Sequence, residues 1–446
     1  QAILAQGAAG IQQPMGRAPP RPAAATRPRR VKPMGGCLQA ACARLALASV
    51  AAALDTAAAF PSSCGGVGTD AWTSPVSAAR GYHVLCIGDS ASSCSSDDDA
   101  ACSATGQVSV SACWGGSRAD CADFAAERPR APLDLEEALA QQRPVANPGR
   151  HGRLKKALEA KGKWAGLYAF FRVEDEARAP RRARAAEELS GLLLVFEGGN
   201  FLWPGVEVGF SRKIGIVEGG EDLQLELITR SLQPLMIEVS SFLDAPECKH
   251  IIDKASPHIA KSAVSHMDHD VGKPDTNWRS SSTYFMPSDD STLRQLDRRV
   301  SALTLTRVNQ QEYAQVLRYN VGERYAAHHD YFDPKMYAKN NDIMGMTKKG
   351  LFNRLATVFF YLTTVEAGGH TNFPRAGGLP QPPDFEDCGR GVSVAPQEGR
   401  VIVFYSQDAA GGLDEYSLHG GCSVSNGTKW SANKWIWSKK MDFLRD

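Results

Sequence analysis

The C-terminal half of the chain carries apolar residues in short runs with frequent alternation, the pattern of β-strands. Glycine, proline and asparagine turns separate five such runs, which read YAQVLRYN, RLATVFFYLTTV, GVSVAPQEG, RVIVFYSQ and NKWIWSKK. Two helices are predicted before them. The first follows Asp244, an acidic N-cap candidate with a proline two residues later. The second places four apolar side chains on one face, namely Leu293, Leu296, Val300 and Leu303. Helices followed by short strands predict an α+β fold with a double-stranded β-helix (jelly-roll) core and flanking helices.

Composition divides the chain into four parts. Residues 1–60 are basic and Pro/Ala-rich, then apolar, so we expect disorder and a targeting function. Residues 61–125 form a Cys-rich segment with few large apolar residues, expected to be stable only when crosslinked. Residues 126–230 form a bridging region, with charged helical stretches followed by the strand-like runs GLLLVFEGG and FLWPGVEVGF. Residues 231–446 form the main domain.

Charge gives no reason to expect a nucleic-acid partner, since 50 basic and 49 acidic residues leave a net charge of +1. The N-terminal part is the exception, because residues 17–32 contain several arginines and no acid. An apolar, alanine-rich run follows from Met34, as in a secretory signal or a single membrane anchor. Arg44 and Asp55 interrupt it, which makes a spanning helix marginal and leaves an amphipathic or organelle-targeting helix open. We expect the secretory pathway, in the lumen or membrane of the endoplasmic reticulum, and leave open whether the run is cleaved.

The cysteines agree with export. Six of the 11 lie close together in the Cys-rich segment: Cys64, Cys86, Cys94, Cys102, Cys113 and Cys121. An even number in a Gly/Ser-rich stretch predicts disulfides in an oxidising compartment, but the sequence does not choose among the possible pairings. A zinc site is disfavoured because no CxxC pair occurs. In the main domain, two of Cys248, Cys388 and Cys422 are expected to pair.

The candidate chemistry centres on His328, Asp330 and His419. In a strand, residues two apart point to the same side, so His328 and Asp330 aim an imidazole and a carboxylate at one point. His419 can add a second imidazole from a distant strand. Two histidines and one carboxylate are the ligand set of non-haem Fe(II) oxygenases. Taken alone, a His-His-Asp sequence is more often a surface or hydrogen-bonded cluster, so the flanking sequence decides the interpretation.

A lysine and a tyrosine extend this constellation toward a dicarboxylate co-substrate. Lys429 begins the last strand, where its ammonium could pair with the far carboxylate of 2-oxoglutarate. Tyr319 precedes His328 and could donate its hydroxyl to the same carboxylate. The alternatives are an exposed strand lysine and an ordinary core aromatic residue.

Four segments in order resemble the catalytic domain of prolyl 4-hydroxylases: VLRYNVGERYAAHHDYF, FFYLTTVEAGGHTNFP, GVSVAPQEGRVIVFYS and LDEYSLHGGCSVSNGTKWSANKWIW. These enzymes are Fe(II)- and 2-oxoglutarate-dependent dioxygenases that act on peptidyl proline. The resemblance spans residues 231–440 and does not extend to residues 1–230. It implies an enzyme that consumes O2 and 2-oxoglutarate, releases succinate and CO2, and uses ascorbate to restore oxidised iron.

The resemblance also assigns roles to individual residues. It implies that the iron ligands are His328, Asp330 and His419. It implies that 2-oxoglutarate is bound by Lys429, which takes the C5 carboxylate, and by Tyr319 and Thr371. Three more positions match residues that line the peptide groove or brace the site: Tyr325, Arg354 and Trp435.

Departures from the family pattern leave the substrate open. No proline follows Cys422, Tyr405 stands where many members have tryptophan, and Trp437 stands where some have histidine. Residues 334–353 are expected to form a longer loop that could act as a lid. None of these positions belongs to the expected iron ligands.

Three functions are therefore compared. The leading one is hydroxylation of proline in a peptide or protein of the secretory pathway. The second is an oxygenase of another residue or of a small molecule. The third is a glycan- or peptide-binding protein with a vestigial oxygenase fold, and the intact ligand set and Lys429 argue against it. A second His/Asp cluster, His266, Asp268 and His269, is expected to lie in an exposed loop. The sequence gives no oligomeric state.

Overall fold

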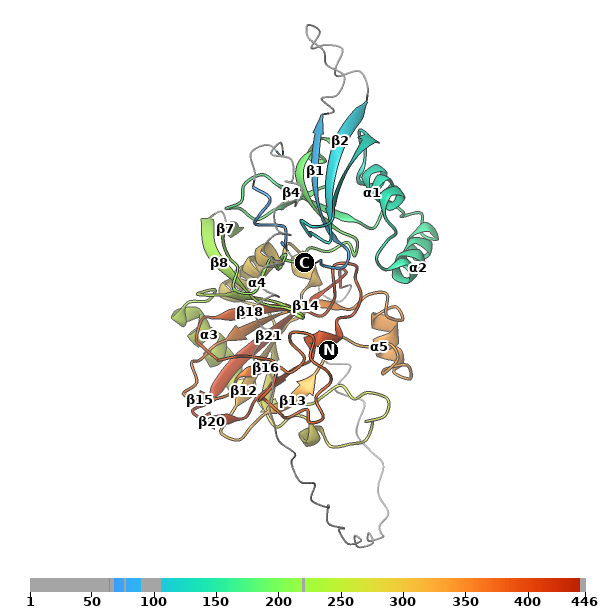
Figure 1. Cartoon of the computed structure of the whole chain (residues 1–446). Coiled ribbons are helices and arrows are strands. Elements are labelled where there is room, and N and C mark those ends of the chain that lie inside the picture. The colour runs from blue at the N-terminus through green and yellow to red at the C-terminus, as the bar shows by residue number, and fades with distance from the viewer. Residues whose placement is uncertain (1–63, 65–67, 76–77, 90–105, 219–220, 442–446) are drawn as a thin grey trace, which may run out of the picture. The chain divides into compact units, whose positions relative to one another are not determined.

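The computed structural model describes residue 64 and residues 68–75, 78–89, 106–218 and 221–441 (Figure 1). The expected targeting segment, residues 1–60, lies outside the described residues, as do Cys94 and Cys102. Among the helices of the described part, none combines the length and apolar character needed to cross a membrane.

The first sheet has six antiparallel strands in the order β3-β2-β1-β6-β4-β5 (Figure 1). The strands are β1 (Tyr82–Asp89), β2 (Gln107–Trp114), β3 (Cys121–Glu127), β4 (Ala169–Val173), β5 (Arg181–Ala183) and β6 (Gly191–Phe196). Helices α1 (Pro132–Gln142) and α2 (Pro148–Glu159) lie between β3 and β4 in the chain. Leu135 and Leu139 of α1 pack into one core with Leu85, Val110 and Leu193 of the sheet. The alternate side chains of β1 and β6 enter a larger second core, which explains why GLLLVF is apolar throughout.

This sheet changes the interpretation of the Cys-rich segment. Disulfides do form there, between Cys64 and Cys86 and between Cys113 and Cys121. However, β1 and β2 also share an apolar core with strands and helices beyond residue 130, so crosslinks are not its sole support. Strands cross the expected limits at residues 125 and 230, because β3 ends at Glu127 and β8 (Glu221–Leu232) runs through the second limit.

Two expectations for the bridging region were wrong. The charged stretch EDEARAPRRARAAEEL, expected to be helical, contains the short strand β5 and one 3-10 turn, Ala186–Glu188. The run FLWPGVEVGF, expected to be a strand, has no regular structure before β7 (Ser211–Glu218). Phe201, Leu202, Trp203 and Val206 are buried instead in an irregular loop, whereas Val208 is exposed. The Trp203 indole donates a hydrogen bond of 2.7 Å to the Leu303 carbonyl oxygen.

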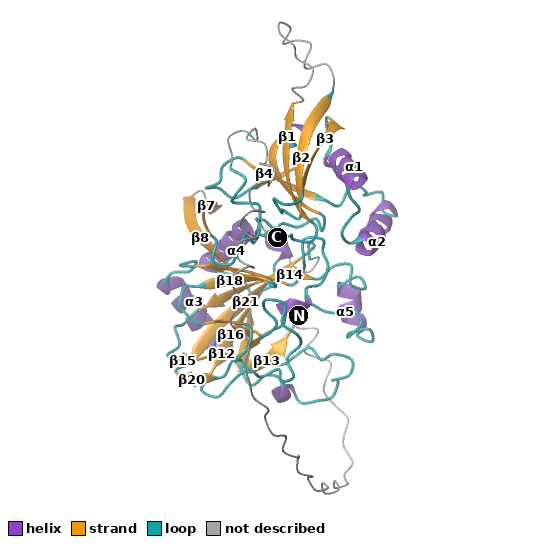
Figure 2. Cartoon of the chain, in the orientation of Figure 1, coloured by secondary structure: helices purple, strands orange, loops and turns teal. Residues whose placement is uncertain are grey.

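The main domain contains a nine-stranded sheet, β10-β11-β12-β21-β14-β18-β9-β8-β7, and a four-stranded sheet, β13-β19-β16-β17, with a small β15-β20 pair (Figure 2). The strands of the large sheet not yet bounded are β9 (Leu235–Val239), β10 (Ala260–Lys261), β11 (Ser282–Met286), β12 (Ala314–Tyr319), β14 (Arg354–Tyr361), β18 (Val401–Tyr405) and β21 (Lys429–Trp437). The others are β13 (Tyr325–His328), β15 (Ala367–Gly368), β16 (Thr371–Phe373), β17 (Val392–Val394), β19 (His419–Gly421) and β20 (Val424–Asn426). Phe359 and Phe404 of the large sheet share a core with Phe373 and Val394 of the small one. The α+β class is therefore confirmed.

Both helices predicted from the apolar pattern are present. Helix α3 (Ala245–Ala255) begins with a capping box, in which the Asp244 carboxylate accepts a 2.7 Å hydrogen bond from the Glu247 amide. Helix α4 (Ser291–Thr304) begins at an Asp290 cap and buries all four leucine and valine side chains of its predicted face. Cys388 and Cys422 form a disulfide and Cys248 is a buried free thiol, so two of the three main-domain cysteines do pair.

Candidate functional site

The structure brings the three candidate metal ligands together. His328 ends β13, His419 begins β19, and the two residues are paired directly across these antiparallel strands. Asp330 lies in a bend just after β13 rather than within the strand, yet its carboxylate turns to the same point. The three ligand atoms lie within 4.8 Å of one another. The Asp330 oxygens are 3.7 Å and 3.5 Å from the Nε2 atoms of His328 and His419.

Backbone carbonyls fix the orientation of both imidazoles. The Nδ1 atom of His328 is 3.0 Å from the Ala326 carbonyl oxygen, and that of His419 is 2.9 Å from the Ser417 carbonyl oxygen. A carbonyl can only accept, so each Nδ1 carries the proton and each Nε2 keeps a lone pair facing Asp330. This is the arrangement that holds a histidine ready for a metal.

The protonation states also suit a cation. Burial alone would raise the pKa of Asp330, but the neighbouring His419 and His328 outweigh it and hold that pKa well below its usual range. Burial lowers the pKa of His419 to about 4, although the Asp330 carboxylate opposes this shift. An ionised carboxylate beside a neutral imidazole is the form in which these side chains bind metals. The residues present therefore fit a divalent iron.

The middle histidine of the motif does not join this cluster. The Nε2 atom of His329 lies 3.1 Å from the Glu415 carbonyl oxygen, and its ring packs beside Tyr331. His329 thus offers a nearby imidazole that is not directed at the other three ligand atoms.

Lys429 is buried among aromatic rings. Its side chain is 1 % exposed, and Lys429 pairs directly with Tyr319 across β21 and β12. The ammonium nitrogen lies 5.2 Å from the Tyr319 ring, 5.4 Å from Phe359 and 5.7 Å from Tyr361. Among the described residues no carboxylate forms an ion pair with it, and burial lowers its pKa to about 7. A desolvated amine among aromatic rings is incomplete without an anion, so it fits a ligand carboxylate.

The other two expected co-substrate residues, Tyr319 and Thr371, both lie against strand β19. The Tyr319 hydroxyl approaches β19 so closely that a Cβ added at Gly421 would stand 3.6 Å from it. Thr371 is buried on β16, opposite Gly421, and its hydroxyl neighbours Tyr361. Strand β19 begins with the metal ligand candidate His419 and ends with Gly421, which lies near Tyr319. The metal ligands and the residues around Lys429 are therefore parts of one site.

Tyr325, Arg354 and Trp435 brace the cluster. The Tyr325 ring stacks on His328 with centroids 3.7 Å apart. The Arg279 guanidinium in turn lies 4.6 Å from the centre of the Tyr325 ring. Arg354 donates a 3.1 Å hydrogen bond to the Asp330 carbonyl oxygen and stacks 3.6 Å from the Trp435 ring. These contacts fix the position of two ligands.

Sequence reasoning missed Thr357, Glu312 and Arg279. The Thr357 hydroxyl donates a 2.5 Å hydrogen bond to the second carboxylate oxygen of Asp330. Glu312 holds Arg354 through two hydrogen bonds of 2.7 Å and 3.0 Å. Only Thr357 had a visible signal, because it is the one polar residue within the apolar run ATVFFYL.

Thr357→Val is expected to weaken iron binding by about ten- to a hundredfold. The substitution keeps the shape of the side chain and removes the hydrogen bond that orients the Asp330 carboxylate. Titration with Fe(II) under anaerobic conditions measures the effect, and Thr357→Ser, which keeps the hydroxyl, should restore most of it. Unchanged iron affinity in Thr357→Val would show that this hydrogen bond does not position the ligand.

The remaining sequence candidates form structural contacts. His266 is half-buried, with Nε2 2.8 Å from Asp275 Oδ1, and Asp268 accepts a 2.9 Å hydrogen bond from the Lys339 amide. Only His269 is exposed as expected. Residues 334–353 include the short helix α5 (Asn341–Met346), which contributes Ile343 to a core with Phe332 and Trp437.

Comparison with known proteins gives consistent matches over the main domain. Residues 314–437 match the family described as the 2OG-Fe(II) oxygenase superfamily. A probable prolyl 4-hydroxylase 10 of Arabidopsis thaliana is 38 % identical over 213 residues, covering 46 % of this chain and 70 % of the relative. Prolyl 4-hydroxylase 5 of the same plant is 35 % identical, covering 50 % and 74 %. A viral collagen prolyl hydroxylase structure from Paramecium bursaria Chlorella virus-1 is 24 % identical, covering 45 % and 95 %, with a TM-score of 0.32, too low to bear on the fold.

Proposed function

Because the chain belongs to the prolyl 4-hydroxylase family of Fe(II)- and 2-oxoglutarate-dependent dioxygenases, we propose that it hydroxylates proline in a peptide or protein. The reaction uses O2 and 2-oxoglutarate and releases succinate and CO2. The observation that carries the proposal is the convergence of His328, Asp330 and His419 within 4.8 Å. Beside them lies a buried lysine for which the described part of the chain provides no ion pair.

One group of residues would bind the iron, and a second group would bind 2-oxoglutarate. His328, Asp330 and His419 would hold the iron, which when bound supplies the oxidising chemistry that couples decarboxylation of 2-oxoglutarate to hydroxylation. Lys429 would bind the far carboxylate of 2-oxoglutarate, with Tyr319 and Thr371 as further contacts. Burial of the ammonium strengthens this pairing, because water no longer competes for either charge.

The bracing residues keep the ligands in place while substrate binds. Arg354, clamped by Glu312, holds the backbone of Asp330, and Tyr325 covers one face of His328. Such positioning matters because small displacements of reacting groups cost large factors in rate. Tyr325, Arg354 and Trp435 also remain our candidates for lining the peptide groove.

The proposal extends to a jelly-roll fold, ascorbate as a reductant and a location in the secretory pathway. The pairing of a large with a small antiparallel sheet around one core supports a jelly roll. Ascorbate would restore iron oxidised in turnovers that do not reach substrate. Three disulfides among the described residues support folding in the secretory pathway, with the endoplasmic reticulum as the proposed site. An N-terminal membrane anchor belongs to the same proposal.

Incubation of the protein with iron, 2-oxoglutarate, ascorbate and proline-rich peptides tests the function. Mass spectrometry should find a peptide product that has gained one oxygen atom at proline. Its amount should equal the amount of succinate formed above the background measured without peptide. Succinate formation that no peptide stimulates would favour an oxygenase of another residue or of a small molecule. Absence of both turnover and iron binding would favour the binding protein and overturn the proposal.

A further inference from the structure

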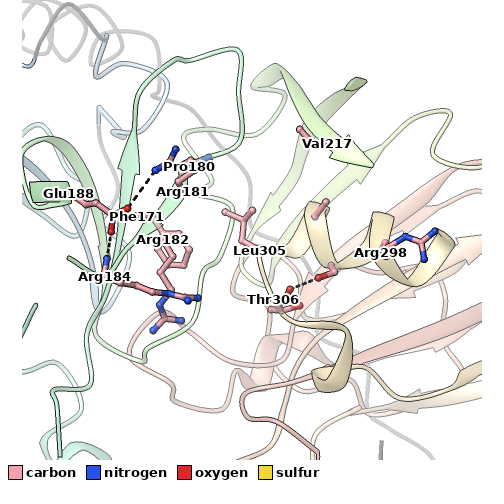
Figure 3. Close-up of a pocket in the computed structure, with 12 residues that line it drawn as sticks. Phe171, Pro180, Arg181, Arg182, Arg184, Glu188, Val217, Arg298, Leu305 and Thr306 are labelled. Carbon is pink, nitrogen blue, oxygen red and sulfur yellow. Dashed lines mark hydrogen bonds and ion pairs between the residues drawn. The ribbon is translucent and has the colours of Figure 1, made fainter. Parts of the chain in front are cut away.

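A hollow of about 650 Å³ lies apart from the iron site, between the first sheet and helix α4 (Figure 3). Its lining includes Arg181, Arg182 and Arg184 on one side and Arg298 on the other. It shares no residue with the metal ligands or with Lys429. Ligand binding at this hollow is therefore separate from the proposed hydroxylation.

The lining of this hollow carries more positive than negative charge. Glu188, the one acidic residue in the lining, is occupied by the Arg184 and Ala185 amides at 2.7 Å and 3.0 Å and by Arg181 at 3.5 Å. Among the described residues, no carboxylate pairs with the guanidinium groups of Arg182, Arg184 or Arg298. The Arg182 side chain keeps exposed surface within the open hollow, yet crowding by protein atoms and the like charges of Arg184 and Arg307 lower its pKa. Arg182 and Arg184 direct their guanidinium groups to the same side of the hollow, whereas the Arg298 guanidinium points away from them (Figure 3). Guanidinium groups that lie close together fit carboxylates, which they bind in a bidentate manner.

The hollow also has an apolar side. Val217, from β7, is 61 % exposed, and Pro180, Ala302 and Leu305 share the lining. Large exposed apolar side chains next to clustered charge are typical of surfaces that bind peptides. A ligand that is polar all along its length would leave Val217 uncovered, so alternating acidic and apolar side chains fit best.

Two sheet edges border the hollow. Strand β5, which carries Arg181 and Arg182, is the last strand of the first sheet, and β7 is the last strand of the nine-stranded sheet. Edge strands present backbone groups that extended chains can pair with. At Gly215 the β7 edge is already occupied by the chain itself, because the Gly215 amide donates a 2.6 Å hydrogen bond to the Ala177 carbonyl oxygen. This contact shows how an extended segment binds at this edge.

We propose that this hollow is a docking surface for an extended acidic peptide segment. Its carboxylates pair with Arg182 and Arg184 on one side, and its apolar side chains cover Val217 on the other (Figure 3). An extended segment presents its side chains alternately on two sides, so acidic and apolar residues in alternation match the two sides of the hollow.

Fluorescence anisotropy with a fluorescein-labelled peptide of alternating glutamate and valine tests the proposal on the full chain. The probe contains no proline, so binding cannot report on a hydroxylation substrate. We expect saturable binding that weakens as salt rises. The double variant Arg182→Glu/Arg184→Glu should bind the probe at least about tenfold more weakly, because two attractions become repulsions. Val217→Ser should weaken binding by a few-fold through lost apolar contact.

The matched control is Arg130→Glu/Arg153→Glu, which makes the same change in net charge at exposed arginines away from the hollow. It should bind the probe within about twofold of the unchanged protein. Equal losses in both double variants, or no binding of the probe at all, would overturn the proposal. A sulfated hexasaccharide that binds more tightly than the peptide, with binding lost in Arg182→Glu/Arg184→Glu, would assign the surface to a glycan instead. Unchanged hydroxylation of a short proline-rich peptide by the variants separates this result from any failure of the proposed function.

Discussion

His419→Ala is expected to lower peptide-stimulated 2-oxoglutarate turnover by more than about a hundredfold. Loss of residues that merely orient a metal ligand already costs ten- to a hundredfold, and His419 supplies a ligand atom itself. The substitution leaves His328 and Asp330, two donors from one end of β13, with no third group from β19. Succinate release measures the activity, and Fe(II) titration measures the metal affinity independently of turnover.

The neighbouring imidazole provides the control for this experiment. His329→Ala removes the same side chain from the same motif, but His329 faces the Glu415 carbonyl oxygen rather than the cluster. Its turnover and iron affinity should stay within about twofold of the unchanged protein. A His419→Ala protein with full activity, or a His329→Ala protein that loses iron, would contradict the assignment of the ligands.

Two of the three candidate metal ligands could be predicted together from the sequence because their geometry is local. His328 and Asp330 are two residues apart and therefore reach the same side, even though Asp330 lies just beyond the strand. His419 required the family resemblance, since no local pattern shows that β19 pairs with β13. The supporting residues depend on the same long-range pairing. Strands β12 and β13 separate Glu312 from Arg354 in the chain, and no sequence pattern around either residue indicates that they form an ion pair.

Secondary structure followed the sequence where one face of an element is buried. Helix α4 illustrates this, because its leucines and valine recur at helical spacing and all become buried. The prediction failed where tertiary contacts decided the outcome. The charged stretch around Arg181 has helical composition, but its backbone pairs with Phe171 and its neighbours at the edge of a sheet. Similarly, the core that β1 and β2 share with β6 joins segments about a hundred residues apart, which composition cannot reveal.

Lys429→Met is expected to raise the 2-oxoglutarate concentration required for half-maximal turnover by at least about thirtyfold, with iron affinity unchanged. The substitution keeps the length of the side chain and removes the charge that would pair with the co-substrate. Loss of one partner of a buried, hydrogen-bonded charge pair costs about 2–5 kcal/mol. Titration of 2-oxoglutarate at saturating iron measures the effect. The control is Lys213→Met, the same change at an exposed lysine of β7, which should leave the requirement unaltered.

Lys429→Met should also stabilise the folded protein in the absence of 2-oxoglutarate. The pKa of Lys429 is about 7 in the folded protein and near 10.5 when unfolded, so the unfolded chain binds the proton more tightly. The resulting penalty on folding is complete below pH 7, shrinks as pH rises from 7 to 10.5, and amounts to a few kcal/mol. Urea unfolding at pH 7 should therefore show Lys429→Met more stable than the unchanged protein, with the difference narrowing at pH 9.5. Adding 2-oxoglutarate at pH 7 with iron present should reverse the order, because only the unchanged protein gains a carboxylate partner for its ammonium. If Lys429→Met were less stable than the unchanged protein without ligand, the Lys429 ammonium would already have a partner within the folded protein. It would then not be available to pair with a carboxylate of 2-oxoglutarate.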